Sequence, residues 1–220
     1  MIKFETPMFR PPSEANSLLV QATIGCSHNN CTYCAMYRGE NQRFRVRPQD
    51  EIFQIIDELS SSKYKRAFVA DGNALVMRTK NLCDIFKEIY KKNSNMQRIS
   101  LYGNVSDILR KKKEDLDMLK ESGLDLVYIG FESGDDKTLK RIKKGATKEE
   151  TVEAMQKLKK SGIKVSGMVL LGVGGKERSF EHAYQTADML SKGDPEYVGL
   201  LSLQVRPGAP LYKDWEDGIF

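Results

Sequence analysis

Hydrophobic and polar positions follow a repeating order along this chain, in which short apolar runs alternate with longer amphipathic segments. The apolar runs are rich in β-branched residues and end at glycine or polar residues, as buried strands do. The amphipathic segments repeat their apolar residues every three to four positions, as helices do. We therefore predict six strands separated by helices, the strands covering residues 18–24, 67–70, 99–102, 126–131, 165–171 and 197–205.

Regular alternation of strand and helix predicts an α/β fold with parallel strands, because parallel neighbours need a crossover connection that a helix supplies. Residues 1–17 contain Pro7, Pro11 and Pro12 and are expected to form an irregular N-terminal arm. Residues 18–220 contain no linker rich in glycine, proline and serine, so we expect them to form one domain. No amphipathic helix is expected between the sixth strand and Phe220.

Composition and charge narrow the classes of function. The chain has 220 residues, of which 40% are hydrophobic, which is enough for one domain with a substantial core. Its formal net charge is +5, and the cations are spread out, which is a weaker signal than a dedicated nucleic-acid binder gives. The first 17 residues show no apolar signal region, and no apolar run reaches membrane length. Together with unpaired thiols, this predicts a cytoplasmic protein.

Three of the four cysteines lie close together. Cys26, Cys31 and Cys34 have the spacing C-x4-C-x2-C, whereas Cys83 falls in a predicted helix. An odd number of clustered thiols argues against a disulfide framework. A zinc site would need a fourth ligand, which His28 in the same loop or a distant residue would have to supply. Three thiolates without an obvious fourth ligand suit an iron–sulfur cluster with one iron left open, and both readings remain possible at this point.

The cysteine block resembles the cluster loop of the radical S-adenosylmethionine (radical SAM) superfamily, whose common signature is C-x3-C-x-aromatic-C. Tyr33 matches the aromatic residue before the last cysteine, while the first spacing is longer by one residue. Residues 128–134, continuing through Leu139 and Ile142 to Lys144 and Thr147, resemble a segment shared by coproporphyrinogen dehydrogenases and methylthiotransferases. The resemblance implies a partial (β/α)6 TIM-like barrel with parallel strands and the chemistry at the carboxyl ends of those strands.

The resemblance also implies roles for the residues that follow the strands. It implies that the three clustered cysteines hold a [4Fe–4S] cluster and that SAM is bound nearby by Tyr33, Asp71, Asn73, Glu132, Ser133, Lys144, Gly172 and Gly174. Asp71 and Asn73 stand where the superfamily's G-G-E motif contacts the methionine ammonium, and Glu132 with Ser133 where the ribose is held. Gly172 and Gly174 stand where the adenine approaches, and Lys144 could pair with the methionine carboxylate.

Each of these assignments has a simpler alternative. Asp71-Gly72-Asn73 is common turn chemistry, and Glu132 can serve a helix N-terminus. Lys144 can be a solvated lysine among other cations, and Gly172 and Gly174 can form a turn without a ligand. Cys83 and His182 are read as ordinary core or cap residues.

As a function, the resemblance implies an enzyme that cleaves SAM reductively to a 5′-deoxyadenosyl radical, which then acts on an unidentified substrate. Its partners would include a low-potential electron donor of the flavodoxin or ferredoxin type. The alternatives are an RNA-modifying member of the family, or a non-catalytic iron–sulfur or zinc module. Cys83 alone supplies too few thiols for a second cluster with three ligands.

Arginines alternate with apolar residues shortly after the cysteines. In an extended segment, Arg43, Arg45 and Arg47 would share one face, where guanidinium groups can capture carboxylate or phosphate. This predicts an anionic substrate at the mouth of the barrel. The alternative is that the arginines pair with acidic neighbours such as Asp50 and Glu51 and only fix the loop.

Overall fold

The computed structural model describes residues 4–220, so residues 1–3 of the predicted arm lie outside it. Its centre is one sheet of six parallel strands. In spatial order these are β1 (Leu18–Gln21), β4 (Arg66–Ala70), β5 (Arg98–Tyr102), β6 (Leu124–Glu132), β7 (Lys164–Leu171) and β8 (Tyr197–Ser202). The strand order follows the chain order, and β1 and β8 are the two edges. The α/β class and the partial, open barrel of parallel strands are therefore confirmed.

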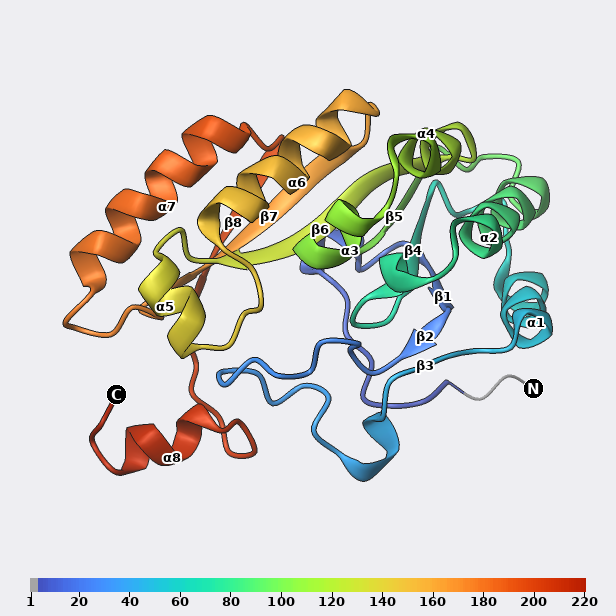
Figure 1. The fold of residues 1–220 in the computed structure, drawn as a ribbon. Coiled ribbons are helices and arrows are strands. Elements are labelled where there is room, and N and C mark those ends of the chain that lie inside the picture. Colours follow the sequence, from blue (N-terminus) through green and yellow to red (C-terminus); the bar gives the residue numbers. More distant parts are fainter. Residues whose placement is uncertain (1–3) are drawn as a thin grey trace.

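Except for the last one, the helices connect the strands and cover one side of the sheet (Figure 1). They are α1 (Gln49–Leu59), α2 (Thr79–Lys92), α3 (Val105–Arg110), α4 (Lys113–Glu121), α5 (Asp136–Arg141), α6 (Lys148–Lys160), α7 (Ser179–Gly193) and α8 (Leu211–Glu216). Three short 3-10 turns are η1 (Pro12–Glu14), η2 (Glu40–Gln42) and η3 (Ala74–Val76). Within the described residues, no helix is long and apolar enough to cross a membrane.

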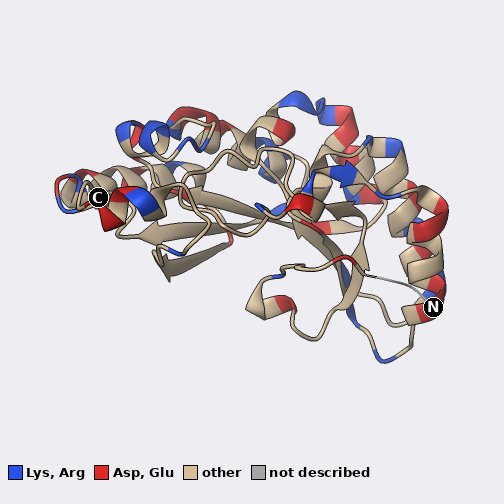
Figure 2. Cartoon of the chain, turned by 90° about the horizontal axis from the view of Figure 1, so that it is seen from below, with Lys and Arg blue, Asp and Glu red and all other residues tan. Residues whose placement is uncertain are grey.

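Alternating side chains give the sheet two different faces. Val69, Leu101 and Val127 point to the helices and belong to the main core. Phe68 and Tyr128 point to the other side, where they form a second apolar cluster on the inner face of the partial barrel. Charged residues gather on the helices of the outer layer, while the strands are almost free of them (Figure 2).

The first predicted strand is wrong in one respect. It is not continuous from 18 to 24 but is divided at Ala22 into β1 and β2 (Thr23–Ile24). β2 leaves the main sheet and pairs antiparallel with β3 (Arg45–Val46). The 20-residue loop from Gly25 to Phe44 therefore starts and ends at one small hairpin, and all three clustered cysteines lie in it.

Between β5 and β6 the chain forms two helices, α3 and α4, separated by Lys111 and Lys112 in extended conformation. One further expectation about the strands is wrong. The sixth strand ends at Ser202 rather than 205, and the short helix α8 follows it. α8 does not cover the outer face of β8. It lies below the sheet in Figure 1, on the side of the cysteine loop, where the amide of Leu211 donates to the carbonyl of Thr32.

The described part of the N-terminal arm is packed against the inner face of the sheet. Glu14, in η1, is fully buried. Its carboxylate accepts hydrogen bonds from Ser100 Oγ (3.0 Å) and Tyr128 Oη (2.8 Å) and forms an ion pair with Arg98. Met8 packs against the inner apolar cluster. The arm therefore closes the inner face from the side of the strands' amino ends, because Arg98 is the first residue of β5.

Candidate active site

The cysteine loop is fixed to its surroundings by backbone contacts. Gly25 opens it at a positive φ of 71°, and a Cβ there would lie 2.2 Å from the carbonyl oxygen of Gln42, so only glycine fits. The amide of Thr32 donates to the carbonyl of Ile142 over 2.9 Å. Arg38 donates to the carbonyls of Cys31 (2.7 Å) and Cys34 (3.2 Å). These contacts hold the loop at the carboxyl ends of the strands.

His28 has a structural role in this loop. Its Nε2 lies 2.8 Å from the carbonyl oxygen of Lys143, and its ring packs against Gly145 so closely that a Cβ there would lie 2.6 Å from it. Among residues 4–220, no three His, Cys, Asp or Glu side chains converge as the ligands of one metal ion do. A cubane cluster does not require such convergence, because each thiolate binds a different iron.

The four thiols fall into two groups. Cys31 is buried, and Cys26 and Cys34 are partly exposed in the loop. Burial raises the pKa of Cys31, and burial also raises the pKa of Cys34. Cys83 lies in the main core, where its Sγ is 3.6 Å from the carbonyl oxygen of Met118. Three thiols are thus presented together, and the fourth is part of the packing.

Glu132 connects two other predicted site residues, Tyr33 and Lys144. It ends β6 at a positive φ of 63°, and its Oε1 accepts hydrogen bonds from Tyr33 Oη (2.7 Å) and Lys144 Nζ (3.0 Å). Gly130 makes room for this pair, since a Cβ there would lie 2.1 Å from Oε1. The carboxylate, the phenol and the ammonium therefore form one network beside the cysteine loop.

The protonation states in this network follow from its contacts. Burial alone lowers the pKa of Lys144, but the Glu132 carboxylate and Cys31 act against it, and the net result is a raised pKa. Burial and then the charge of Glu132 raise the pKa of Tyr33 well above its usual value. Lys144 is therefore an ammonium and Tyr33 a neutral phenol at physiological pH. The reading of Lys144 as a solvated lysine is not what the structure shows.

Asp71 follows β4 and is fully buried. Tyr37 Oη donates to Oδ1 of Asp71. The backbone amide of Asp71 donates to Thr23 Oγ1 over 3.1 Å. Its Oδ2 is buried and makes no hydrogen bond of standard geometry within residues 4–220. Burial raises the pKa of Asp71 from 3.8 to about 6, although the amides of Phe9 and Gly72 and the Gln21 side chain act on the carboxylate and lower the pKa. A buried carboxylate oxygen without a well-placed donor is costly and marks a position where a ligand donor would be stabilised.

Asn73 shows the same feature two residues later. It is fully buried, and its Nδ2 donates to Ser27 Oγ (2.7 Å) and to the carboxylate of Asp107. Its Oδ1 is buried and has no partner within the described chain. Because Ser27 follows Cys26, Asn73 lies directly beside the start of the cysteine loop.

Ser133 lies behind Glu132 and is not exposed. Its Oγ is 2.8 Å from Nδ1 of His182 and accepts from the amide of Asp135 over 3.0 Å. His182 is buried on α7, as the reading of a core residue expected. Asp135 in turn holds Arg178 through two hydrogen bonds of 2.7 and 2.8 Å, and these hydrogen bonds from Arg178 lower the pKa of the carboxylate. This layer supports the end of β6.

The two predicted glycines of the turn after β7 differ in their surroundings. Gly172 has a positive φ of 85° and is exposed, and the nearest atom to an added Cβ would be Leu203 Cβ at 4.0 Å. Gly174 is buried, and a Cβ there would lie 2.9 Å from the carbonyl oxygen of Arg178. Gly172 therefore presents bare backbone to solvent, whereas Gly174 is required by the packing of the turn onto α7.

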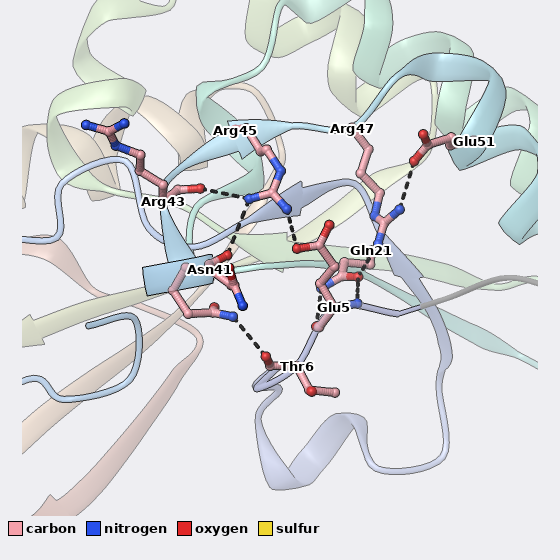
Figure 3. Close-up of polar contacts among 9 residues, drawn as sticks. Glu5, Thr6, Gln21, Asn41, Arg43, Arg45, Arg47 and Glu51 are labelled. Atoms are coloured by element: carbon pink, nitrogen blue, oxygen red, sulfur yellow. Dashed lines mark hydrogen bonds and ion pairs between the residues drawn. The ribbon is translucent and has the colours of Figure 1, made fainter. Parts of the chain in front are cut away.

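The three arginines after the loop point to different places (Figure 3). Arg45 forms an ion pair with Glu5 and is exposed, while Arg47 is buried and donates to Glu51 (2.8 Å) and Gln21 (2.9 Å). The alternative that the arginines pair with acidic neighbours is thus correct for Arg47, which pairs with Glu51. Arg45 also pairs with an acid, but this is Glu5 of the arm. The guanidinium of Arg43 points away from this network in Figure 3.

Sequence reasoning missed Tyr37 and Arg38. Tyr37 connects the loop to Asp71, and its ring packs edge-on against Phe9 of the arm at 5.5 Å between centroids. Arg38 closes the turn between Cys31 and Cys34. Their position within four residues of Cys34 was the only available signal, and proximity alone does not assign a contact.

Comparison with known proteins decides the family. A family model described as the radical SAM superfamily matches residues 20–190 of the chain. The chain belongs to the radical SAM superfamily. Members of this superfamily use a [4Fe–4S] cluster and SAM, so these are the cofactors of this radical SAM protein. The match favours an iron–sulfur cofactor over zinc.

Curated relatives of this radical SAM protein are distant and longer. A protein of Methanocaldococcus jannaschii provisionally named a methylthiotransferase is 26% identical over 160 residues, covering 70% of this chain and 35% of the relative. The bacteriochlorophyllide d C-12(1)-methyltransferase of Chlorobaculum tepidum is 26% identical over 209 residues, covering 91% and 43%. The chain thus spans less than half the length of these two relatives.

Solved structures agree on the fold. Methylornithine synthase has a TM-score of 0.67 with 17% identity, covering 88% of this chain and 55% of that one. The methyltransferase TsrM from Kitasatospora setae, solved with cobalamin and a [4Fe–4S] cluster bound, has a TM-score of 0.69 with 18% identity and covers 88% and 38%. Coproporphyrinogen III oxidase from Escherichia coli has a TM-score of 0.66 with 14% identity, covering 87% and 44%.

Proposed function

We propose that this radical SAM enzyme holds its cluster on Cys26, Cys31 and Cys34 and binds SAM along the carboxyl ends of β4, β6 and β7. The observation that carries the proposal is the pair of orphaned acceptors beside the cysteine loop. Asp71 Oδ2 and Asn73 Oδ1 are both buried and make no hydrogen bond of standard geometry among the described residues. An ammonium group brings three donors, which is the chemistry that these two oxygens lack.

The donor set of the loop fits the cluster. Soft thiolates suit iron–sulfur centres, and three of them leave one iron for a ligand from SAM. The Lys144 ammonium and the Arg38 guanidinium stand beside the loop and offset the negative charge that three thiolates introduce. When bound, the reduced cluster supplies the electron that cleaves SAM to methionine and a 5′-deoxyadenosyl radical.

The other residues position SAM. Glu132 presents a carboxylate to the ribose hydroxyls, and Lys144 and Tyr33 fix that carboxylate in place. Ser133 supports Glu132 from behind rather than touching the ribose, because its hydroxyl is already bonded to His182 and Asp135. Gly172 offers the adenine an open stretch of backbone.

The substrate is proposed only by class. Arg43 leads directly into Phe44, and a Cβ on Gly25 would lie 3.3 Å from the amide of Phe44, so the two ends of the cysteine loop lie side by side. The guanidinium of Arg43, unlike those of Arg45 and Arg47, points away from Glu5 of the arm and Glu51 of α1 in Figure 3. This supports an anionic substrate group held near Arg43.

A tRNA substrate is the second candidate. It is favoured by one relative, the tRNA-2-methylthio-N(6)-dimethylallyladenosine synthase of Finegoldia magna, which is 27% identical over 213 residues, or 90% of this chain and 44% of that protein. tRNA binding that weakens steeply with salt would support it.

The test is reconstitution with iron and sulfide without oxygen, followed by reduction and addition of SAM. We expect a brown protein that forms 5′-deoxyadenosine slowly on its own. Addition of deuterated cell metabolites should then yield deuterium-bearing 5′-deoxyadenosine when the substrate is present. A colourless protein that retains zinc, or a brown one that never cleaves SAM, would contradict the proposal.

A further inference from the structure

The segment from α5 to Gly145 has an unbalanced charge. Residues 137–144 contain no acid and carry the cations Lys137, Lys140, Arg141, Lys143 and Lys144. Lys144 is turned inward to Glu132. The other four side chains are exposed, while Thr138, Leu139 and Ile142 cover the buried side of the same turn.

Several lysines elsewhere on the helices have acidic partners, whereas these exposed cations have none in the described part of the chain. Lys148 pairs with Asp188, and Lys159 pairs with Asp194. Within residues 4–220, no ion pair involves Lys137, Lys140 or Lys143. Arg141 donates to the carbonyl of Val173 and stacks on Phe220, so its charge is also not neutralised by an acid. The turn therefore presents a concentrated positive surface.

This surface lies on the part of the molecule that holds the cysteine loop. The carbonyl of Ile142 accepts from Thr32, which lies between Cys31 and Cys34. The carbonyl of Lys143 contacts His28 of the same loop. Arg38 adds a further exposed cation on the loop itself.

We propose that Lys137, Lys140 and Lys143 form the docking surface for an acidic one-electron carrier protein of the flavodoxin class. The inference rests on the proposed cluster site. In the docked complex the carrier loses one electron and the cluster gains it, with no bond made or broken. Complementary charge raises association rates by about 10- to 1,000-fold at low salt, and a compact patch beside the acceptor directs the carrier to it.

A nucleic acid fits this surface less well. A phosphate backbone needs a groove or stripe of cations that follows it over many nucleotides. Here the exposed cations Lys137, Lys140 and Lys143 lie within seven residues of one turn, which is too short for such a stripe. A compact acidic protein matches a surface of this extent better.

The experiment uses the reconstituted holoprotein and a flavodoxin as the probe. Cluster reduction by flavodoxin hydroquinone is followed by stopped flow at several salt concentrations, and binding of oxidised flavodoxin is measured by calorimetry. The variant carries Lys137→Glu, Lys140→Glu and Lys143→Glu. The matched control carries Lys65→Glu, Lys87→Glu and Lys160→Glu, three exposed lysines away from the carboxyl ends of the strands.

We expect the patch variant to lose at least about tenfold in the second-order rate and in affinity at low salt, and to lose most of the salt dependence. The control should stay within about twofold of the wild type. Iron content and reduction by dithionite should be unchanged in both. Equal losses in both variants, or no loss in the patch variant, would overturn the docking surface. A patch variant that loses tRNA binding but keeps its reaction with flavodoxin would also overturn it. Failure to hold iron in the unmodified protein would instead contradict the proposed cluster site.

Discussion

Lys144 donates to Glu132 Oε1 over 3.0 Å, and their side chains are only 13% and 10% exposed. Breaking such a pair leaves a buried charge without a partner, which is strongly destabilising locally. Tyr33, one residue before Cys34, donates to the same oxygen. The Glu132 carboxylate thus couples the cysteine loop to the end of β6 and to the turn after α5.

Replacement of Glu132 tests this coupling. Glu132→Ala should weaken SAM binding by about tenfold or more, because it removes a charged hydrogen-bond acceptor and leaves Lys144 unpaired. The visible spectrum of the cluster should change little. Calorimetric titration with SAM provides the measurement, and Glu132→Ala combined with Lys144→Met should lose less than the sum of the two single changes. Unchanged SAM affinity in Glu132→Ala would remove this residue from the site.

The four cysteines should separate into two classes. Cys26→Ala, Cys31→Ala and Cys34→Ala should each abolish cluster binding, because a three-ligand site does not tolerate loss of one thiolate. Cys83→Ala is the matched control and should keep full iron content, since its thiol lies in the core against Met118. Iron and sulfide analysis after reconstitution gives the answer. Loss of iron in Cys83→Ala would refute the proposal that only three cysteines hold the cluster and that one iron is left without a cysteine ligand.

The pKa of Asp71, raised by burial from 3.8 to about 6, predicts opposite pH trends for binding and stability. The ionised carboxylate is the form that accepts from the methionine ammonium. SAM affinity should therefore weaken below pH 6, by up to about tenfold per pH unit. Asp71→Asn should bind SAM more weakly and show no such dependence between pH 5 and 7.

Stability follows from proton linkage. The folded state holds the Asp71 proton more tightly than the unfolded chain, so its contribution to the free energy of unfolding is present below about pH 4. It is lost as pH rises to about 6, by at most about 1.4 kcal/mol per unit. Asp135, whose pKa is lowered by Arg178, contributes in the opposite direction. Denaturant unfolding of wild type and Asp71→Asn at each pH isolates the Asp71 part, and identical profiles would contradict a raised pKa.

The buried carboxylate of the arm should matter for the whole fold. Glu14→Ala removes an acceptor shared by Ser100 and Tyr128 and leaves Arg98 without its ion-pair partner. We expect a loss of about 3 kcal/mol in the free energy of unfolding. Asp57→Ala, which breaks an exposed pair with Lys92, should cost far less, because solvent screens exposed pairs. Similar losses in the two variants would show that the arm is not anchored as described.

The arginines provide a test of the anionic substrate. Arg43→Ala should keep the cluster and uncoupled SAM cleavage but lose turnover of the substrate once it is identified. Arg47→Ala should reduce stability, because the buried Gln21 and the Glu51 carboxylate lose their donor. Thermal unfolding and product formation, measured on both variants, distinguish the roles. Full turnover in Arg43→Ala would leave the anionic substrate without support.

Local patterns were sufficient to predict the order of the elements and the polar residues at the strand ends. Glycines and polar residues end apolar runs where parallel strands present their carboxyl ends, so Asp71, Glu132 and Gly172 could be placed at one edge from sequence alone. Their contacts could not be predicted. Tyr33 and Glu132 are 99 residues apart, and only the curvature of the sheet decides that they meet.

Burial of polar groups was the other limit. Arg47 alternates with apolar residues as Arg45 does, yet it is buried, because α1 supplies Glu51 four residues later and β1 supplies Gln21. Ser133 looked like a residue facing the ribose, but α7 brings His182 against it. In each case a distant element provides the partner, and the local sequence pattern contains no information about it.

The contacts of Glu14 also determine when the N-terminal arm can pack against the sheet during synthesis of the chain. Glu14 leaves the ribosome early, but its partners Arg98 and Tyr128 lie 84 and 114 residues further on. At about 5–20 residues per second, the Tyr128 hydroxyl becomes available roughly 6 to 20 seconds later. The three cysteines of the loop, the last of which is Cys34, emerge within the first few of those seconds. For the rest of that interval the inner face of the sheet is not covered by the arm. A bulky group fused to the amino end would therefore be attached to the segment that packs last.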